Sequence, residues 1–355
     1  MPGTPRTRRW LMACAVIAAA AVAPAAQAAQ QYSLTLTKSP TNTRFFGLNA
    51  AGDVFGKAFE AGTNATQAFL LRNGSTKLQF LGAPGDPTNS HSVTSPEGIN
   101  RSDAVVGTAT DLNTGAQHAV EWQNSSTPTD IGALPGIANN YANPDLTAIN
   151  DDGLITGFGR GLHGNVGFTV NGSQVTPLPV LPSNGVDAEP LAVNNSGLIV
   201  GWGDTTSQGP IAVAWQNGAI NVLGELPGSL ESKAFAVNGL GEAVGGSLAP
   251  DRNVHAVAYL NGQVIDLNVP GSGFHDAQAN AINDSGVIVG SDGFSHAFTY
   301  QNGGSTDLNT LIPTGSGVTL VNATGVNASG VIVGTAVPNN GTSATYGFKL
   351  TPVTK

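Results

Sequence analysis

The side chains best suited to acid–base chemistry or ligand binding gather in a few irregular segments of the chain. His275 and Asp276 form the sharpest candidate acid–base pair, although adjacency in sequence does not place two side chains on one substrate. Ser, His and Asp are all present, but no Gly-x-Ser-x-Gly elbow accompanies them, so the pattern does not indicate a serine hydrolase. We predict a ligand-binding set that comprises Trp202, Asp204, Asp251, Arg252, His275, Asp276 and Asp292.

Two other patterns raise the question of a metal site. The segments NDDG at 150–153 and NDSG at 283–286 are faintly similar to calcium loops. Calcium takes six to eight oxygen ligands, and these segments lack the spaced acidic ligands and the terminal Glu of an EF-hand. His118, His255 and His296 each precede Ala-Val or Ala-Phe, but only two of them lie in neighbouring repeats. We therefore predict capped turns and structural histidines, with no metal and no cofactor.

A repeat organises almost the whole chain and must position these residues. It is aligned on seven anchor asparagines, namely Asn49, Asn100, Asn150, Asn194, Asn238, Asn283 and Asn327. A glycine follows each anchor by seven residues, at Gly56, Gly107, Gly157, Gly201, Gly245, Gly290 and Gly334. An Asn that opens a type I turn can bond to the backbone two residues on, and the residue three later then adopts the left-handed conformation that glycine tolerates best. Each copy therefore begins as strand, turn and strand.

The rest of each copy supplies two further strands. A third strand carries an Ala-Phe or Ala-Val pattern, as in 296–300, and Asn-Gly turns such as Asn217-Gly218 and Asn302-Gly303 follow it. Asn-Gly is the strongest short hairpin signal, and a fourth strand such as VIDLN at 264–268 comes next. Four antiparallel strands in each copy predict one propeller blade. We expect an all-β, seven-bladed β-propeller over residues 29–355.

The ends of the chain predict how the ring closes. The seventh copy stops after its third strand, at 344–351, whereas the segment 32–37 is a strand without a copy of its own. Tyr32, Leu34 and Leu36 lie on one face of that strand. We predict that it becomes the fourth strand of the last blade.

The strand connections predict two unlike faces. The Asn-x-x-Gly and Asn-Gly turns lie on one side of the ring, which we call the short-turn face. Connections between strands two and three, and from blade to blade, lie on the opposite side, which we call the long-loop face. The long-loop face carries the predicted ligand-binding set, and function on rigid scaffolds concentrates in such loops. Variable loops that have merely drifted are the alternative explanation.

The repeat resembles the HAF-type extracellular repeat, named for a His-Ala-Phe tripeptide that stands here as His296-Ala297-Phe298. The resemblance covers seven copies, although the third and seventh copies read Val166-Gly167-Phe168 and Tyr346-Gly347-Phe348. It implies an exported bacterial repeat protein and implies no activity.

The first 28 residues have the features of a secretory signal. Arg6, Arg8 and Arg9 precede a short apolar stretch, and Ala26-Gln27-Ala28 offers a cleavage site. Thr7 to Met12 also resembles a twin-arginine motif, so the export route stays open. The only cysteine, Cys14, lies inside this segment. We expect a secreted protein, either extracellular or periplasmic, without disulfides and without a membrane span.

Charge narrows the range of partners. Removing the three signal arginines leaves 11 of the 14 basic residues against 23 acidic ones, a net charge of −12. Nucleic-acid binding needs clustered Lys and Arg, so it is not expected. We predict a monomeric, non-catalytic binding or surface-interaction module whose partner is a glycan or a cell-envelope protein. The alternative is a propeller hydrolase or lyase with a site at the channel mouth on the long-loop face.

Overall fold

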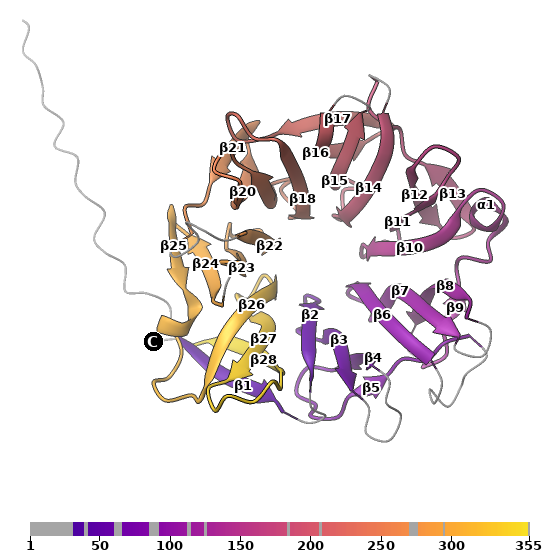
Figure 1. Ribbon diagram of the computed structural model, residues 1–355. Helices are drawn as coiled ribbons and strands as arrows, with labels where there is room; N and C mark the ends of the chain where they lie inside the picture. Colours follow the sequence, from indigo (N-terminus) through magenta and orange to yellow (C-terminus); the bar gives the residue numbers. More distant parts are fainter. Residues whose placement is uncertain are drawn as a thin grey trace, which may run out of the picture.

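Seven four-stranded antiparallel sheets stand around a central axis in the computed structural model of the chain (Figure 1). The structure describes residues 31–38, 42–59, 66–84, 92–111, 115–123, 126–182, 185–205, 208–269, 276–293 and 295–353. Helix is limited, within these ranges, to one short turn, α1 (Pro135–Ala138), and one 3-10 turn, η1 (Leu308–Thr310). The predicted all-β, seven-bladed propeller is confirmed.

The first four blades follow the chain from the innermost strand outward. Blade one contains β2 (Arg44–Leu48), β3 (Val54–Phe59), β4 (Thr66–Leu71) and β5 (Gln79–Phe80). Blade two contains β6 (Ser92–Ile99), β7 (Ala104–Asp111), β8 (Gln117–Gln123) and β9 (Thr129–Asp130). Blade three contains β10 (Ala142–Ile149), β11 (Ile155–Arg160), β12 (Asn165–Asn171) and β13 (Gln174–Pro177). Blade four contains β14 (Gly185–Val193), β15 (Ile199–Thr205), β16 (Gln208–Gln216) and β17 (Ala219–Gly224).

The last three blades continue the same order. Blade five contains β18 (Glu231–Val237), β19 (Ala243–Leu248), β20 (Val254–Leu260) and β21 (Gln263–Asp266). Blade six contains β22 (Gln278–Ile282), β23 (Ile288–Ser291), β24 (Ala297–Gln301) and β25 (Gly304–Asp307). Blade seven contains β26 (Val318–Val326), β27 (Ile332–Pro338), β28 (Tyr346–Pro352) and, as its outermost strand, β1 (Tyr32–Thr37).

Closure occurs as the sequence predicts. Strand β1 pairs antiparallel with β28 from Tyr32 opposite Pro352 to Thr37 opposite Gly347. Tyr32 is buried in the same apolar cluster as Leu308 and Leu311, and Leu34 and Leu36 pack against that cluster. The first strand of the described chain thus completes a sheet made otherwise by the last three.

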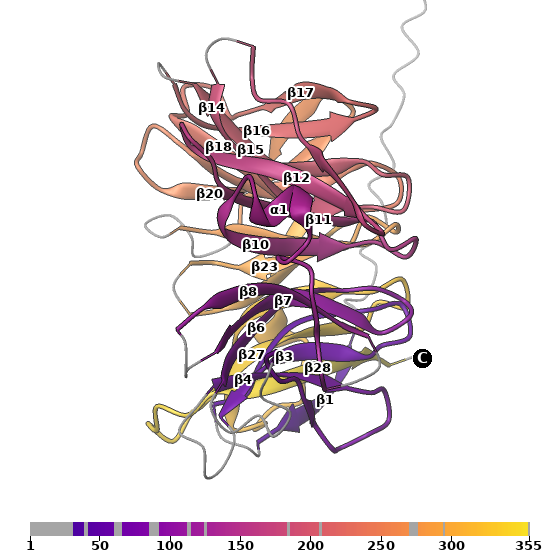
Figure 2. The same ribbon diagram turned by 90° about the vertical axis from the view of Figure 1, so that its right-hand side faces the viewer.

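The turns have the predicted geometry. The third residue after each anchor Asn has a positive φ; it is glycine in six blades and Asp103, with φ 60, in blade two. Both residues of the Asn217-Gly218 and Asn302-Gly303 hairpins have positive φ, as a type I′ turn requires. Seen from the side, the strands run between the two flat sides of the ring and the connections collect on those sides (Figure 2).

Apolar side chains fill the junctions between blades. Leu70 of blade one, for example, belongs to one buried cluster with Val105 and Trp122 of blade two. The ring is therefore held by sheet faces packed on one another, which leaves the innermost strand edges free to line a channel. Within the described ranges, no helix has the length and apolar character of a membrane span. The predicted signal segment, residues 1–28, lies outside the described residues.

Candidate functional site

Each innermost strand carries a bulge that aims one side chain at the centre of the ring. The register between the first and second strands shifts at the same place in all seven blades, between Phe45 and Gly47 in blade one. A bulge leaves one residue unpaired and redirects its side chain. The unpaired residues line a central cavity of ≈ 270 Å³, and they are Phe46, Glu97, Thr147, Leu191, Phe235, Asn280 and Thr324.

The recurrent glycine seven residues after each anchor Asn makes the bulge possible. A Cβ atom on Gly245 would lie 1.9 Å from the carbonyl oxygen of Lys233, and one on Gly107 would lie 2.0 Å from that of Ser95. No side chain fits at such a distance, so only glycine allows the two strands to approach there. The glycine on the second strand thus allows the bulge on the first strand, and the bulge turns its unpaired residue toward the channel.

One charged side chain, that of Glu97, lines the central cavity, and further charged residues of blades one to three act on it. Ser95 Oγ donates to Glu97 Oε1 at 2.7 Å, and Lys57 and Asp145 act electrostatically on the same carboxylate. Burial raises the pKa of Glu97 although the residue keeps an exposed surface, which is the situation of a carboxylate inside a channel. Burial also raises the pKa of Asp145 and lowers that of Lys57.

A second charged group stands across blades three to five. The ammonium group of Lys233 lies 4.6 Å from the centre of the Trp202 ring, a cation–π contact. Trp202 pairs in register with Glu189, whose Oε1 accepts from Asn165 Nδ2 at 2.6 Å. Burial raises the pKa of Glu189, although this hydrogen bond and the charge of Lys233 act in the opposite direction.

Neutral amides occupy the remaining sector of the channel. Asn280 Nδ2 donates to Asn322 Oδ1 at 2.7 Å and to the carbonyl of Ala323 at 2.9 Å. The seven bulge residues that line the cavity are therefore of mixed character: Glu97 is charged, Thr147, Asn280 and Thr324 are polar, and Phe46, Leu191 and Phe235 are apolar.

The short-turn mouth of the channel has a different chemistry. Each anchor Asn is buried and its Oδ1 accepts backbone N–H of its own turn; in the first six anchors, Nδ2 also donates to the carbonyl of the next anchor. These donations link six successive junctions, from Asn49 to Asn100 (3.2 Å) through to Asn283 to Asn327 (2.9 Å). We call this series the asparagine belt. Its polar atoms hold blades together, which is a second reason, beyond turn capping, for the repeated Asn.

The predicted ligand-binding residues fall into two groups. Trp202 and Asp204 both lie on β15, and Asp204 Oδ1 accepts from the backbone N–H of Asp187 at 2.9 Å. Trp202 reaches the charged sector described above. Asp292 is buried, and its Oδ1 accepts from the backbone N–H groups of Ser295 and His296. These bonds give Asp292 a part in shaping its loop.

The other predicted residues lie at the rim of blades five and six. Asp251 and Arg252 are exposed in one turn, and Arg252 has a φ of 69. Asp276 Oδ1 accepts from the backbone N–H of Val254 at 2.9 Å. His275 lies outside the described residues. Ligand binding by this set stays a prediction; the set did not include Lys57, Glu97, Asp145, Glu189 or Lys233, which lie on the first two strands of their blades.

The three His-Ala histidines share one role. His118 Nδ1 lies 2.7 Å from Asp130 Oδ2, His255 Nδ1 lies 2.7 Å from Asp266 Oδ2, and His296 Nδ1 lies 3.0 Å from Asp307 Oδ2. Each pair joins the third strand of a blade to the end of its fourth strand. Copies without the histidine also lack the aspartate. In blade one, for instance, Gln67 stands at the histidine position and Phe80 at the aspartate position, and in blade three these positions hold Val166 and Pro177. This internal correlation could have been found in the sequence.

The site is suited to polar and ionic binding. Within the described ranges, no three His, Cys, Asp or Glu side chains are grouped so that they could hold a metal ion. The cavity itself offers the carboxylate of Glu97 and the amide of Asn280, while Asp145, Glu189, Lys233 and Trp202 lie on the first and second strands of blades three to five. Such a lining can bind a charged or hydrogen-bonding group that enters from the long-loop mouth.

Comparisons with known proteins support the fold. No family model matches the chain, and no curated protein matches it in sequence. YCF48 bound to D1 peptide is similar in structure at 11% identity, with a TM-score of 0.52, over 93% of this chain and 97% of that one. YCF48 from Cyanidioschyzon merolae gives 9% identity and a TM-score of 0.50, over 90% and 98% of the two chains.

TolB from Acinetobacter baumannii is also similar in structure. It shows 10% identity and a TM-score of 0.44, and the likeness covers 66% of this chain and 60% of the TolB chain. The chain thus spans less than two thirds of that protein. At these identities the likenesses concern the fold alone, and membership of the HAF-type family stays a prediction.

Proposed function

We propose that the chain is an exported, monomeric, non-catalytic binding module that acts outside the cytoplasm, in the periplasm or outside the cell. The basic, apolar and small-residue regions of residues 1–28 support export. Its partner is a cell-envelope protein or glycan that presents a cationic or polar group to the long-loop mouth of the channel. The HAF-type resemblance of the repeat supports the same assignment.

The observation that carries this proposal is a set of three partly buried carboxylates on the innermost strands of the ring, one of which lines the central cavity. Glu97, Asp145 and Glu189 belong to the innermost strands of three successive blades, and burial raises the pKa of each carboxyl. Within the described ranges, no ion pair joins them to Lys57 or Lys233. Carboxylates that are partly dehydrated and lack a direct counter-ion gain most from a cation delivered by a partner. At the opposite mouth, the polar atoms of the asparagine belt are already bonded to the protein.

Matched charge removals on the two faces test the proposal. One variant carries Glu97→Gln with Glu189→Gln, and the control carries Asp152→Asn with Asp284→Asn in exposed short turns. Both variants lose two negative charges, so long-range attraction falls equally. Binding of the mature chain to isolated cell-envelope fractions, and to oligolysine as a defined cationic probe, is then measured at two salt concentrations.

We expect the channel variant to bind at least ~10-fold more weakly, because it loses desolvated charge contacts, and the control to change by less than ~3-fold. Circular dichroism checks that both variants fold. Equal loss of binding from both folded variants would contradict the assignment of the face.

A hydrolase or lyase at the same mouth is the second candidate, favoured by one contact. Glu97, with its raised pKa, accepts from Ser95 Oγ and is close enough to Asp145 for that carboxylate to raise the pKa of Glu97 further, so two acidic groups influence one another. Turnover of any glycan or ester substrate that disappears with Glu97→Gln, while oligolysine binding by the wild-type chain is absent, would favour the enzyme.

A further inference from the structure

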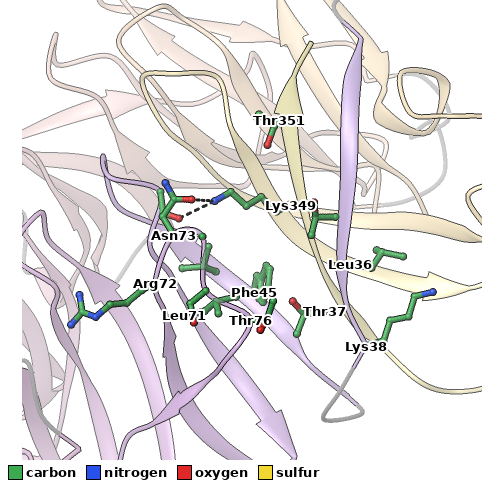
Figure 3. Close-up of a pocket in the computed structure, with 15 residues that line it drawn as sticks. Leu36, Thr37, Lys38, Phe45, Leu71, Arg72, Asn73, Thr76, Lys349 and Thr351 are labelled. Carbon is green, nitrogen blue, oxygen red and sulfur yellow. Dashed lines mark hydrogen bonds between the residues drawn. The ribbon is translucent and has the colours of Figure 1, made fainter.

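The junction between blades seven and one differs from the other six junctions. The asparagine belt, as far as the described residues show it, is open between Asn327 and Asn49. Other groups bridge this junction: Thr324 Oγ1 donates to the carbonyl of Phe45 at 2.9 Å, and Lys349 Nζ donates to the carbonyl of Gly52 at 3.2 Å and to Asn73 Oδ1 at 2.7 Å. Lys349 reaches from β28 across to the turns of blade one (Figure 3).

A groove of ≈ 470 Å³ lies at this junction, and we call it the seam groove. That volume is within the range of small-molecule sites. Strands β1 and β28 and the residue after β1 contribute hydroxyl groups and the ammonium groups of Lys38 and Lys349 (Figure 3). Blade one contributes an amide, two hydroxyls, the guanidinium of Arg72 and an apolar floor. The lining residues used below are Thr35, Thr37, Asn73, Thr76, Lys349 and Thr351.

Lys349 is an unusual side chain for its position. The other six blades place Leu70, Glu121, Thr169, Ala214, Ala258 and Thr299 at the same register of the third strand. Burial lowers the pKa of Lys349, and within the described ranges no carboxylate forms an ion pair with it. The charge of Asp53 acts to raise the pKa of Lys349 but forms no ion pair with it. The Asp53 carboxylate instead accepts from Asn73 N at 2.6 Å and from Asn49 Nδ2.

An ammonium group has three N–H donors, and the two described bonds of Lys349 go to neutral acceptors. A partly dehydrated cation with a donor to spare is stabilised by an anion. Within the described ranges, the hydroxyls of Thr35, Thr37, Thr76 and Thr351 have no hydrogen-bond partner in the protein, and Thr35, Thr76 and Thr351 are exposed. Arg72, which also lines the groove, is ion-paired with Asp103, and Lys38 lies at its edge beside Tyr346. Hydroxyl and amide groups around the cation of Lys349 match a ligand that combines several hydroxyls with one carboxylate.

We propose that the seam groove binds a sugar acid, with its carboxylate on Lys349 and its hydroxyls on the surrounding threonines. This site does not depend on the function proposed for the channel. The ligand is either a free sugar acid or the same residue within an acidic polysaccharide.

The test measures binding of glucuronate to the full mature chain by ligand-observed NMR, with polygalacturonate as the polymeric arm. We expect a dissociation constant of about 1 mM or tighter for a ligand of this size. Glucose, which lacks the carboxylate, and acetate, which lacks the hydroxyls, should each bind at least ~10-fold more weakly. Binding of the polymer alone would assign the site to a polysaccharide, and binding of both would include the free acid.

Three variants complete the test. Lys349→Gln should weaken glucuronate binding at least ~10-fold, and Thr351→Val, which keeps the Lys349 bridge and therefore the closure of the ring, should weaken it ~2–10-fold. Arg160→Gln removes one exposed charge from blade three and should change nothing. The proposal is overturned if wild-type protein binds no sugar acid, if glucose binds as well as glucuronate, or if folded Thr351→Val and Lys349→Gln both bind like the wild type.

Discussion

His118, His255 and His296 each contact an aspartate of the fourth strand of the same blade and so hold that outer strand in place. His255 has an additional contact, because its Nε2 lies 3.1 Å from Asp251 Oδ2 while Nδ1 faces Asp266. Partial burial lowers the pKa of His255, but the hydrogen bonds and charges of Asp266 and Asp251 outweigh burial, and the net pKa lies above 6.5. Hydrogen bonds from Asn253 and His255 lower the pKa of Asp251 to about 2.

This arrangement makes the stability of blade five depend on pH. Because the folded pKa of His255 is raised, its protonated form contributes stability below the unfolded pKa of 6.5, and the contribution is lost as pH rises through the folded value. We expect His255→Gln to lower the free energy of unfolding more at pH 5.5 than at pH 8.5, by a few tenths of a kcal/mol since the group is partly exposed. Urea denaturation at the two pH values measures the difference.

The exposed loop residue His163 provides the control. His163→Gln should give the same small change at both pH values, because no described hydrogen bond or ion pair holds that side chain. A pH-independent effect of His255→Gln would mean that the Asp–His–Asp contacts carry no charge linkage.

Among the secondary-structure elements, the innermost strands decide what the ring can bind. Every blade repeats the same bulge opposite a glycine, while the residue at the bulge varies from Phe46 to Glu97 to Asn280. The glycine that lets the two strands approach is therefore the same in every blade, whereas the side chain at the bulge, which lines the channel, differs from blade to blade. Glu97 is the charged residue among these seven positions.

A single added methyl group tests this device. Gly245→Ala places a Cβ against the backbone of Lys233, which cannot rotate away as a side chain could. We expect a loss of about 1–3 kcal/mol or more in the free energy of unfolding. Gly304→Ala, on the exposed strand β25 with nothing within 4 Å of the added Cβ, should change stability by less than about 0.5 kcal/mol. Similar losses from both variants would argue against the bulge as the reason for the repeated glycine.

The sequence predicts strands and turns because their chemistry is local. Asn opening a turn and glycine or Asp103 at the left-handed position specify each hairpin without reference to the rest of the chain. The bulge could not be predicted in this way, since it depends on the register between two strands and neither strand contains that information alone. The loop-based set of predicted ligand-binding residues accordingly includes Trp202 but not Glu97 or Lys233, and it stays a prediction. The asparagine belt was hidden for a similar reason, because its bonds join residues 44 to 51 positions apart.

Over the whole molecule, stability and function both depend on closing the ring. Strand β1 supplies the outer strand of blade seven, buries Tyr32 and places Thr35 and Thr37 in the seam groove. Blade seven combines the first described strand, β1, with the last three, β26 to β28. Its sheet is complete only when these segments, which are far apart in the sequence, are both present. The junction between blades seven and one is also the one at which the asparagine belt is open. Lys349 bridges this junction through its hydrogen bonds to the turns of blade one.

Removal of β1 should therefore destabilise the entire ring. Burial of Tyr32 alone contributes about 1.5–3 kcal/mol, a large share of a total stability of about 5–15 kcal/mol, and the loss of Leu34 and Leu36 adds to it. A mature chain that begins after residue 38 should melt at a much lower temperature or aggregate through the exposed edge of β28. Trimming residues 354–355 is the control and should leave the melting temperature unchanged. A synthetic peptide of residues 31–38, added in trans, should restore much of the lost stability, because it can occupy the vacant strand position. Equal melting temperatures for the two truncations, or no effect of the peptide on a truncated chain that stays soluble, would contradict closure by β1.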